Sequence, residues 1–470
     1  MILEPQAADA PNPISLRAAG ALGRLEDNVG WAERNLRKIR IGGSISEVSS
    51  THYRVAGLSR HARLGDCVRI EDGRHEQLGE IVRIDGAQVT VKPFDVRCDA
   101  TIGARAYVKE PLALWPSAAW KGRVIDALGR PIDGGGELEQ GLDAMPFDAP
   151  PPPAMRRSRV KRYQRTGVRV VDCFTPICAG QRIGIFAGSG VGKSSLLAML
   201  ARAPDCSVVV IALVGERGRE VREFLDDVLG ESRKSAIAVV STGDESPMMR
   251  RLAPKTAMTV AEYFRDRGEQ VLLIVDSVTR FAHAARDVAL VSGEPPVARG
   301  YPPSVFSELP RLLERAGPGV DGSGSITGIF SVLVDGDDQN DPVADSIRGT
   351  LDGHVVLSRA IADQGRYPAM DMLASISRLA SAVWTPDRAK LVANLRRLIA
   401  RYEETRDLRL MGGYLSGSDP LLDQAIKIVP RMYEAMAQST SSPPSLDAFQ
   451  EFGALLAQEV AHDETRPTGQ

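Results

Sequence analysis

The strongest constraint on the fold is a glycine-rich run at residues 187–194, which reads Ala-Gly-Ser-Gly-Val-Gly-Lys-Ser. A short apolar run at residues 183–186 precedes it, and a helix-forming segment at residues 195–200 follows it. A strand, a glycine loop and a helix in this order are the context that a phosphate-binding loop requires. The glycines let the loop curl with its N–H groups inward, and these amides bind an anion together with the helix N-terminus. The sequence therefore predicts an α/β sheet with a nucleotide phosphate site at one strand end.

Each position of this loop has an expected role. Lys193 is expected to reach the terminal phosphates, and the Ser194 hydroxyl is expected to ligate Mg²⁺, a cation that prefers oxygen ligands. Ala187 stands where the pattern usually has glycine, and alanine suffices there if its φ is negative. The remaining nucleotide contacts are predicted at Gly188, Ser189, Gly190, Val191, Gly192 and Ser195.

Two further apolar runs end in carboxylates. The run 271–275 ends at Asp276, which we expect to hold the Mg²⁺ shell. The run 208–214 is followed by Gly-Glu-Arg, and ligands bind beyond the carboxyl ends of strands in open α/β sheets. Glu216 is therefore a candidate base for the attacking water, and Arg217 can face the phosphates. The alternative is an ordinary helix N-terminal turn that carries mixed charge.

The chain divides into regions with different periodicity. Residues 39–108 carry short strands and glycine turns, which predict a small β-barrel. Between about 165 and 380, short β-branched runs alternate with helical stretches, as in a doubly wound parallel sheet. The runs are 183–186, 208–213, 237–240, 271–275 and 329–334, and the helical stretches include 220–228 and 256–267. The predicted regions are a flexible partner-binding segment at 1–36 with a possible helix within 16–40, a barrel at 37–110, a P-loop ATPase domain at 111–385 that includes a linker at 134–164, and a helical domain at 386–470.

Composition narrows the class of protein. Lys and Arg number 58 against 60 Asp and Glu in 470 residues, a formal net charge of −2, which argues against a strongly basic nucleic-acid binder. There is no apolar run of membrane-spanning length and no secretory signal, and five scattered cysteines form no C-x-x-C pair. We therefore expect a cytosolic chain with reduced thiols. The basic run 156–162 is interpreted as a solvated segment, with a phosphate- or partner-facing edge as the alternative.

Longer motifs carry a resemblance to a known family. The phosphate loop, Gly-Glu-Arg-Gly-Arg-Glu at 215–220 and Asp-Ser-Val-Thr-Arg at 276–280 resemble the catalytic subunits of rotary ATP synthases and their secretion relatives. The resemblance is strongest to the flagellum-specific type III protein-export ATPases and spans about residues 36–430. The motifs that narrow it are Gly-Tyr-Pro-Pro-Ser-Val-Phe at 300–306, Leu-Pro-Arg-Leu-Leu-Glu-Arg-Ala-Gly at 309–317, Gly-Asp-Asp-Gln-Asn-Asp-Pro-Val-Ala-Asp at 336–345 and Leu-Asp-Gly-His-Val-Val-Leu-Ser-Arg at 351–359.

The resemblance implies a RecA-like core between the barrel and the helical domain, and it implies site roles. Glu216 matches the glutamate that activates water. Arg378, in Ser-Ile-Ser-Arg at 375–378, matches an arginine finger that reaches the nucleotide of a neighbouring subunit. Tyr367 matches the aromatic residue that stacks on adenine, and Arg280 matches a further phosphate-side arginine. From the residues alone, Arg378 would be a surface residue and Tyr367 a core residue.

The resemblance also implies ligands and partners. ATP and Mg²⁺ are expected at the site, in a ring that is typically a homo-hexamer. A stator-like regulatory subunit, a central stalk protein, the export gate and export chaperone–substrate complexes are the expected partners, and nucleic acid is not. The chain would work in the cytoplasm, peripheral to the inner membrane through its partners. Residues 1–36 match nothing firm, and the C-terminal region lacks the acidic cluster of the synthase catalytic subunit, which favours an export ATPase.

Three alternatives stay open. The first is the equivalent ATPase of a virulence injectisome. The second is a ring RNA helicase, which needs a basic, aromatic barrel. The third is a ring subunit that does not hydrolyse ATP, against which Glu216 and Asp276 argue. The acidic residues that argue against the helicase are Asp66, Glu71, Asp72, Glu76, Glu80 and Asp85.

Overall fold

A computed structural model of the chain describes residues 40–73, 75–228, 230–334 and 341–454. The predicted N-terminal segment 1–36 lies outside the described residues, as does the helix expected within 16–40 apart from Arg40. The first half of the motif at 336–345 also lies outside them.

The first described domain is a closed β-barrel, as the sequence predicts. Its strands pair antiparallel in the order β1-β2-β5-β4-β3-β6. The barrel interior is apolar, with Tyr53, Val55, Ile70, Ile81 and Val91 at 1% exposure or less. The strands are β1 (Gly42–Val48), β2 (Tyr53–Ala56), β3 (Cys67–Asp72), β4 (His75–Ile84), β5 (Gln88–Pro93) and β6 (Arg105–Val108).

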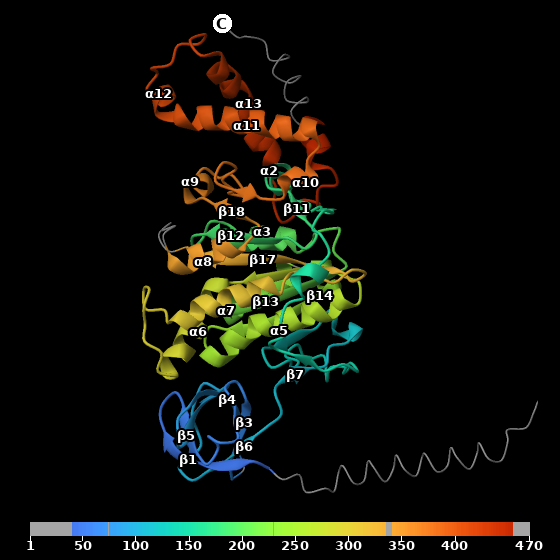
Figure 1. Cartoon of the computed structure of the whole chain (residues 1–470). Helices are drawn as coiled ribbons and strands as arrows, with labels where there is room; N and C mark the ends of the chain where they lie inside the picture. Colours follow the sequence, from blue (N-terminus) through green and yellow to red (C-terminus); the bar gives the residue numbers. More distant parts are fainter. Residues whose placement is uncertain (1–39, 74, 229, 335–340, 455–470) are drawn as a thin grey trace, which may run out of the picture. The chain divides into compact units, whose positions relative to one another are not determined.

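The central domain is built on a sheet of nine strands among the described residues (Figure 1). Its order is β19-β18-β12-β17-β15-β13-β14-β8, with β16 paired to β17. All neighbours pair parallel except β19 on β18 and β16 on β17. The strands are β8 (Val124–Asp126), β12 (Arg182–Ala187), β13 (Val208–Glu216), β14 (Ala236–Thr242), β15 (Gln270–Asp276), β16 (Gly317–Pro318), β17 (Ser325–Leu333), β18 (Gly353–Leu357) and β19 (Ile376–Ser377).

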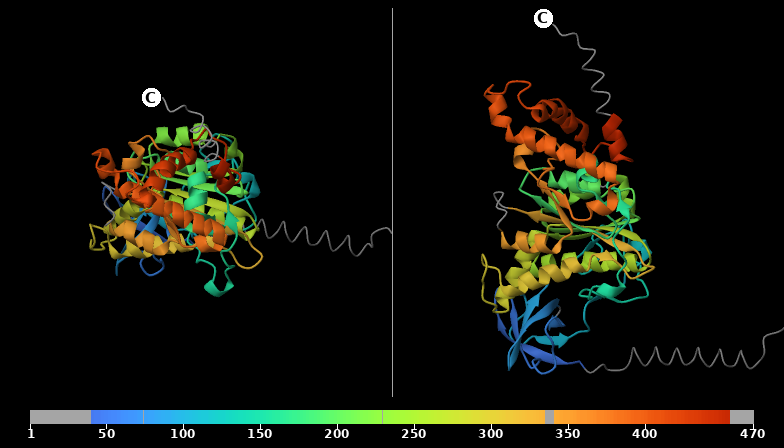
Figure 2. Two further views of the ribbon diagram at one scale, coloured as in Figure 1. Left: turned by 90° about the horizontal axis from the view of Figure 1, so that it is seen from above. Right: turned by 45° about the horizontal axis from the view of Figure 1, so that its top comes forward.

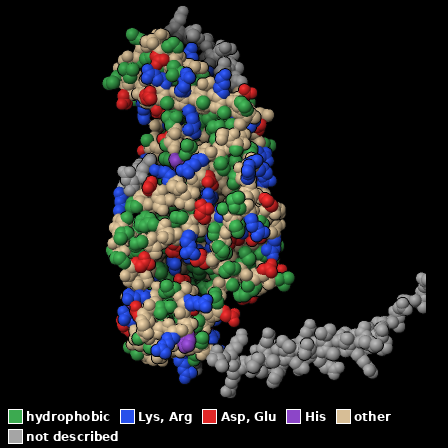
Figure 3. All heavy atoms as spheres, in the orientation of Figure 1, with side chains coloured by type: hydrophobic (Ala, Val, Ile, Leu, Met, Phe, Trp, Pro, Cys, Tyr) green, Lys and Arg blue, Asp and Glu red, His purple; other side chains and the backbone are tan. Residues whose placement is uncertain are grey.

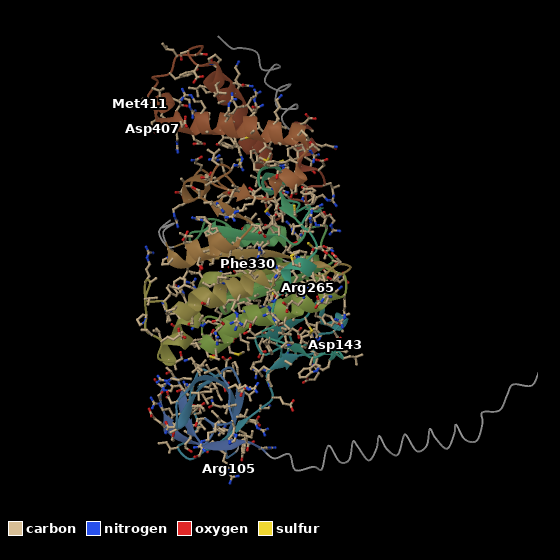
Figure 4. All side chains as sticks on the ribbon, in the orientation of Figure 1. Arg105, Asp143, Arg265, Phe330, Asp407 and Met411 are labelled. Carbon is tan, nitrogen blue, oxygen red and sulfur yellow. The ribbon has the colours of Figure 1, made fainter. Side chains whose placement is uncertain are left out.

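Both faces of this sheet are covered, which explains its continuous apolar strands. In β13, Val208, Val210, Ala212 and Val214 pack into one core cluster, which takes in side chains of α5, α6 and α7. The alternate residues of β13 pack into a second cluster with α3. Figure 2 shows the strands between these helix layers, and Figure 4 labels Phe330, a residue of β17 that belongs to the first cluster.

The helices of the central domain follow the sheet strands as a doubly wound fold requires. They are α2 (Arg169–Phe174), α3 (Lys193–Leu200), α4 (Gly218–Glu223), α5 (Pro247–Asp266), α6 (Val278–Val291), α7 (Pro303–Glu314), α8 (Pro342–Thr350), α9 (Arg359–Ala362) and α10 (Ala380–Val383). Short two-strand pairs complete the domain, β7 (Ala113–Leu114) with β9 (Met145–Pro146) and β10 (Tyr163–Gln164) with β11 (Ile177–Cys178).

Two predicted helices have different bounds in the structure. The stretch predicted at 256–267 begins already at Pro247, because the Ser246 side chain accepts from Met249 N–H and proline fits the first helical turn. The stretch predicted at 220–228 is divided, since α4 ends at Glu223 and a π-helical turn spans Phe224–Val228. The N-cap at Ser246 therefore sets where α5 begins, and the π-helical turn sets where α4 ends. The spacing of apolar residues does not define either bound.

The last described region is helical, as predicted. It contains α11 (Pro386–Glu404), α12 (Arg406–Leu410) and α13 (Pro420–Met436). Val392 and Leu395 of α11 pack with Ala425 and Val429 of α13, and these residues belong to the same core cluster as α3. The helical region is therefore continuous with one face of the central core.

The surface carries no large field of one charge on the face shown in Figure 3, where basic, acidic and apolar side chains are interspersed. This mixture agrees with the formal net charge of −2. Among the described residues, no helix combines the length and the apolar character needed to cross a membrane.

Candidate functional site

The glycine-rich run forms a loop between β12, which ends at Ala187, and α3, which begins at Lys193. Gly190 has φ +76° and Gly192 has φ +89°, a left-handed conformation that side chains with a Cβ rarely adopt. Gly192 is the N-cap of α3 and provides no side-chain hydrogen bond. The N–H groups of the first turn are therefore left for a ligand, and the positive end of the helix favours an anion there.

Lys193 and Asp276 lie together beside this loop. The Lys193 ammonium is paired with Asp276 Oδ1, and the two side chains are only 11% and 5% exposed. Ser331 Oγ, on β17, donates to the same carboxylate oxygen at 2.6 Å. A lysine at the start of α3, a carboxylate at the end of β15 and a hydroxyl on β17 thus meet at one point.

Glu216 ends β13, close to this pair. Its side chain is 13% exposed, and Arg280 Nε lies 3.5 Å from Glu216 Oε1. Arg280 also donates to the Gly215 carbonyl at 2.5 Å, which fixes the guanidinium beside the strand end. Burial, followed by the negative charge of Asp276, raises the pKa of Glu216, while Lys193 and Arg280 oppose that shift. A carboxylate with increased proton affinity is suited to accept a proton from water.

Arg217 is placed differently from its predicted role. It is the N-cap residue of α4, its side chain is 85% exposed, and it pairs with Glu220 at 3.2 Å. This geometry is that of a solvent-facing helix turn. A role for Arg217 toward the phosphates stays a prediction that this conformation does not support.

Tyr367 lies against the phosphate loop. Two carbons of its ring are 3.2 Å from the position that a Cβ on Gly192 would occupy, so glycine is needed there for close approach as well as for its φ. Tyr367 is 44% exposed and therefore accessible to a ligand. This position agrees with the expected stacking face and not with core packing.

Arg378 is not brought to the loop of its own chain. It follows β19, and its N–H donates to the Asp352 carbonyl at 2.9 Å. Ser377 pairs with Gly353 at the start of β18, whereas the loop follows Ala187, which pairs with Leu357 at the end of that strand. Arg378 is thus exposed at the end of the strands opposite to the phosphate loop of its own chain.

Sequence reasoning missed two residues of the site. Ser331 contacts Asp276, and its signal was a hydroxyl inside the apolar run 329–334. Arg359 donates to the Ser189 carbonyl of the loop at 2.8 Å. Its signal was the motif at 351–359, which supported the resemblance without an assigned role.

The oxygen donors near the loop fit a hard divalent cation. Ser194 is exposed in the first turn of α3, directly after Lys193, and the Asp276 carboxylate at the end of β15 contacts Lys193. Among the described residues, no group of three or more His, Cys, Asp or Glu could hold a metal by itself. A hydroxyl and one carboxylate, completed by phosphate oxygens and water, form the kind of site that Mg²⁺ uses.

Comparison with known proteins also identifies a nucleotide-binding domain in the region that contains the phosphate loop. Residues 167–377 match the ATP synthase alpha/beta family, nucleotide-binding domain, and residues 384–451 match the T3SS EscN ATPase C-terminal domain. A flagellum-specific ATP synthase of Rhizobium meliloti is 57% identical over 88% of this chain and 89% of its own length. A type 3 secretion system ATPase of Xanthomonas euvesicatoria is 44% identical over 87% of this chain and 93% of its own length.

Solved structures give the same result. The assembled ATPase EscN of the enteropathogenic E. coli type III secretion system superposes with a TM-score of 0.83 at 40% identity, over 88% of this chain and 100% of EscN. EscN has also been solved in complex with its central stalk EscO, and that structure superposes with a TM-score of 0.80 at 38% identity, over the same shares of the two chains. On the loop, the strand-end residues and these similarities together, the chain belongs to the flagellar and type III secretion ATPases of the ATP synthase alpha/beta family.

Proposed function

We propose that this chain is the ATP-hydrolysing ring subunit of a bacterial flagellar protein-export apparatus. The observation that carries the proposal is the convergence of Lys193, Asp276, Glu216 and Arg280 beside a helix N-terminus that lacks a side-chain cap. The similarity to flagellum-specific relatives supports the flagellar assignment. The ring would use ATP to release and unfold export substrates.

The phosphates of ATP bind to the loop amides, the N-terminus of α3 and Lys193. Because Lys193 is paired with Asp276, it exchanges part of that contact for the phosphates when the nucleotide binds. Ser194 and Asp276 would hold Mg²⁺, which neutralises charge on the phosphate oxygens when it is bound. Tyr367 offers its exposed face to the adenine ring.

Glu216 accepts a proton from the attacking water as the water oxygen bonds to the terminal phosphorus of ATP. The bond from that phosphorus to the bridging oxygen breaks, and ADP and phosphate are the products. Arg280 keeps the carboxylate in place through its contacts with Glu216 and Gly215. The charge that develops on the phosphoryl oxygens is stabilised by Lys193 and by Arg378 of the neighbouring subunit. Hydrolysis therefore requires a ring, in which each site lies between two subunits.

The partners follow the same reasoning. EscN was solved assembled and with its central stalk, which supports a homo-hexamer around a stalk protein for this chain. A stator-like regulatory subunit, the export gate and export chaperone–substrate complexes complete the proposed set. These partners would hold the chain at the cytoplasmic face of the inner membrane.

The test is the substitution Glu216→Gln, which keeps the side-chain shape and removes the base. We expect binding of a fluorescent ATP analogue to persist and turnover to fall by about 10²–10⁴-fold, the contribution of a positioned base. Glu223→Gln is the matched control, because Glu223 is half exposed on α4 and its ion pair is with the exposed Arg219. Unchanged turnover in Glu216→Gln would remove the proposed base.

A second candidate is the injectisome ATPase, which the similarity to EscN favours. A deletion strain separates the two candidates. Loss of motility and of filament export, with host-directed secretion intact, supports the flagellar role. The reverse pattern supports the injectisome.

A further inference from the structure

Gln181 is a fully buried polar residue that the proposed mechanism does not use. It is 0% exposed and lies immediately before β12. Its Oε1 accepts from Cys178 N–H at 2.9 Å, and its Nε2 donates to the Asp352 carbonyl at 3.2 Å and to Ser377 Oγ at 3.0 Å. Because both amide hydrogens and the oxygen have partners, the side chain has one fixed orientation.

Two of these partners, Asp352 and Ser377, are directly linked to Arg378. The Asp352 carbonyl that accepts from Gln181 also accepts from Arg378 N–H, at 2.9 Å. Ser377, the other acceptor, is the residue directly before Arg378. Gln181 therefore binds both the carbonyl that accepts from the Arg378 amide and the side chain of the residue before Arg378.

The segment that bears Arg378 is anchored at Ser375, whose carbonyl accepts from Arg396 at 3.0 Å and whose Oγ accepts from Val356 N–H at 3.0 Å. Gln181 contacts Ser377, the residue next to Arg378. β19 comprises only Ile376 and Ser377, and it pairs with β18 alone, at the edge of the sheet. The direction of an exposed arginine side chain depends on its backbone, and a misplacement of about 1 Å at a reacting centre can cost about 100-fold in rate. We infer that Gln181 is a positioning residue that orients Arg378 toward the nucleotide of the neighbouring subunit. This inference rests on the proposed function, since it requires Arg378 to act between subunits.

The position of Gln181 predicts which of two sites loses activity when Gln181 is replaced, the site of its own chain or that of the neighbouring subunit. The adjacent Arg182 binds the Asp352 carboxylate through its backbone N–H at 3.0 Å and its guanidinium at 3.1 and 3.2 Å. β12 runs from this anchor to the phosphate loop of the same chain. A purely structural role for Gln181 would therefore disturb its own loop, whereas a positioning role disturbs the neighbour's site.

The experiment begins with Gln181→Met, which keeps the volume of the side chain and removes all three hydrogen bonds. We expect kcat of homogeneous rings to fall by about tenfold or more, while KM for ATP and the affinity for a fluorescent ATP analogue stay within about twofold. Gln164→Met is the matched control. Gln164 is also buried, but it contacts Thr327 at 2.5 Å and Cys206 at 2.9 Å and none of the residues around Arg378.

Rings of mixed subunits distinguish a positioning role of Gln181 from a purely structural role. When Gln181→Met subunits assemble with Glu216→Gln subunits, some interfaces combine an intact Glu216 with a finger that Gln181 supports. We expect turnover to exceed that of either homogeneous ring. Unchanged kcat in Gln181→Met rings, or a loss that mixing does not restore, would overturn the inference.

If Gln181→Met does not fold, a second variant still tests the positioning role of Gln181. Ser377→Ala removes one acceptor of the Gln181 amide from the opposite side, and it should lower kcat in the same restorable way. Different results would contradict the inference and the proposed function. Full turnover of homogeneous Glu216→Gln rings contradicts the proposed function, whereas full turnover of homogeneous Gln181→Met and Ser377→Ala rings contradicts only the positioning role.

Discussion

Complementation between two inactive variants should reveal that each catalytic site is shared by two subunits. Glu216 lies at the carboxyl end of β13, whereas Arg378 follows β19 beside the start of β18. The five residues from Gly353 to Leu357 are joined by four steps, so the two ends of β18 are about 13 Å apart at about 3.3 Å per step. An arginine side chain extends about 7 Å from its Cα. Arg378 therefore cannot reach the phosphates of its own chain.

The expected magnitude follows from this arrangement. Glu216→Gln should lower turnover by about 10²–10⁴-fold and Arg378→Ala by about 10³–10⁵-fold in homogeneous rings. In a ring mixed at random in equal parts, a site is intact when an Arg378→Ala subunit supplies Glu216 and a Glu216→Gln neighbour supplies Arg378. About one quarter of the sites meet both conditions. If the sites hydrolyse ATP independently of one another, turnover should return to about one quarter of the wild-type value.

The assay is steady-state ATP hydrolysis by subunits mixed before ring assembly, with ring formation checked by size. A mixture of Glu216→Gln and Lys193→Ala is the control, because both defects lie in the subunit's own half of the site and no intact site forms. Turnover of the Glu216→Gln and Arg378→Ala mixture equal to the mean of its two components would refute the shared site. Cooperation between sites would reduce the recovery below one quarter without abolishing it.

The remaining predictions concern binding, pH dependence and stability. Lys193→Ala should weaken nucleotide binding in an equilibrium titration, because the loop loses its cation, and unchanged affinity would contradict that role. Burial raises the pKa of Glu216 and Arg280 opposes this shift, so turnover should fall as the pH drops toward that pKa, and Arg280→Gln should move the acid limb of the kcat profile to higher pH. Glu262→Ala should destabilise the fold by about 3–5 kcal/mol in urea unfolding, because the buried Arg315 guanidinium loses two charge-assisted bonds of 3.0 and 2.7 Å. Replacing both Glu262 and Arg315 by methionine should cost far less, and an equal loss in the double variant would argue against the unpaired charge as the cause.

Much of the site was predictable from the sequence, because its parts are local. The loop from Gly188 to Ser194 specifies its own conformation through glycines at positive φ, and Asp276 and Glu216 each end an apolar strand. In a parallel sheet, the carboxyl ends of adjacent strands meet at one edge, so such residues come together without knowledge of their side-chain contacts. The resemblance added Tyr367 and Arg378, which no local pattern distinguishes.

The parts that sequence reasoning missed depend on contacts between distant segments. Ser331 contacts Asp276 across neighbouring strands, and Arg359 reaches Ser189 from a helix that follows β18. Arg217 shows the opposite case, in which a residue adjacent to Glu216 in sequence points to solvent because it starts a helix. Sequence neighbours at a strand end face different directions, and only the packed structure shows which of them enters the site.

The sequence by itself determined the class of fold, the phosphate loop and the strand-end carboxylates, because backbone conformation and apolar periodicity are local properties of the chain. The tertiary structure decided which side chains meet. It placed Lys193 against Asp276, held Glu216 beside Arg280, and set Arg378 at the far end of the strands with Gln181 behind it. The physical reason is that these contacts arise from strand order and register, which residues far apart in the chain determine together.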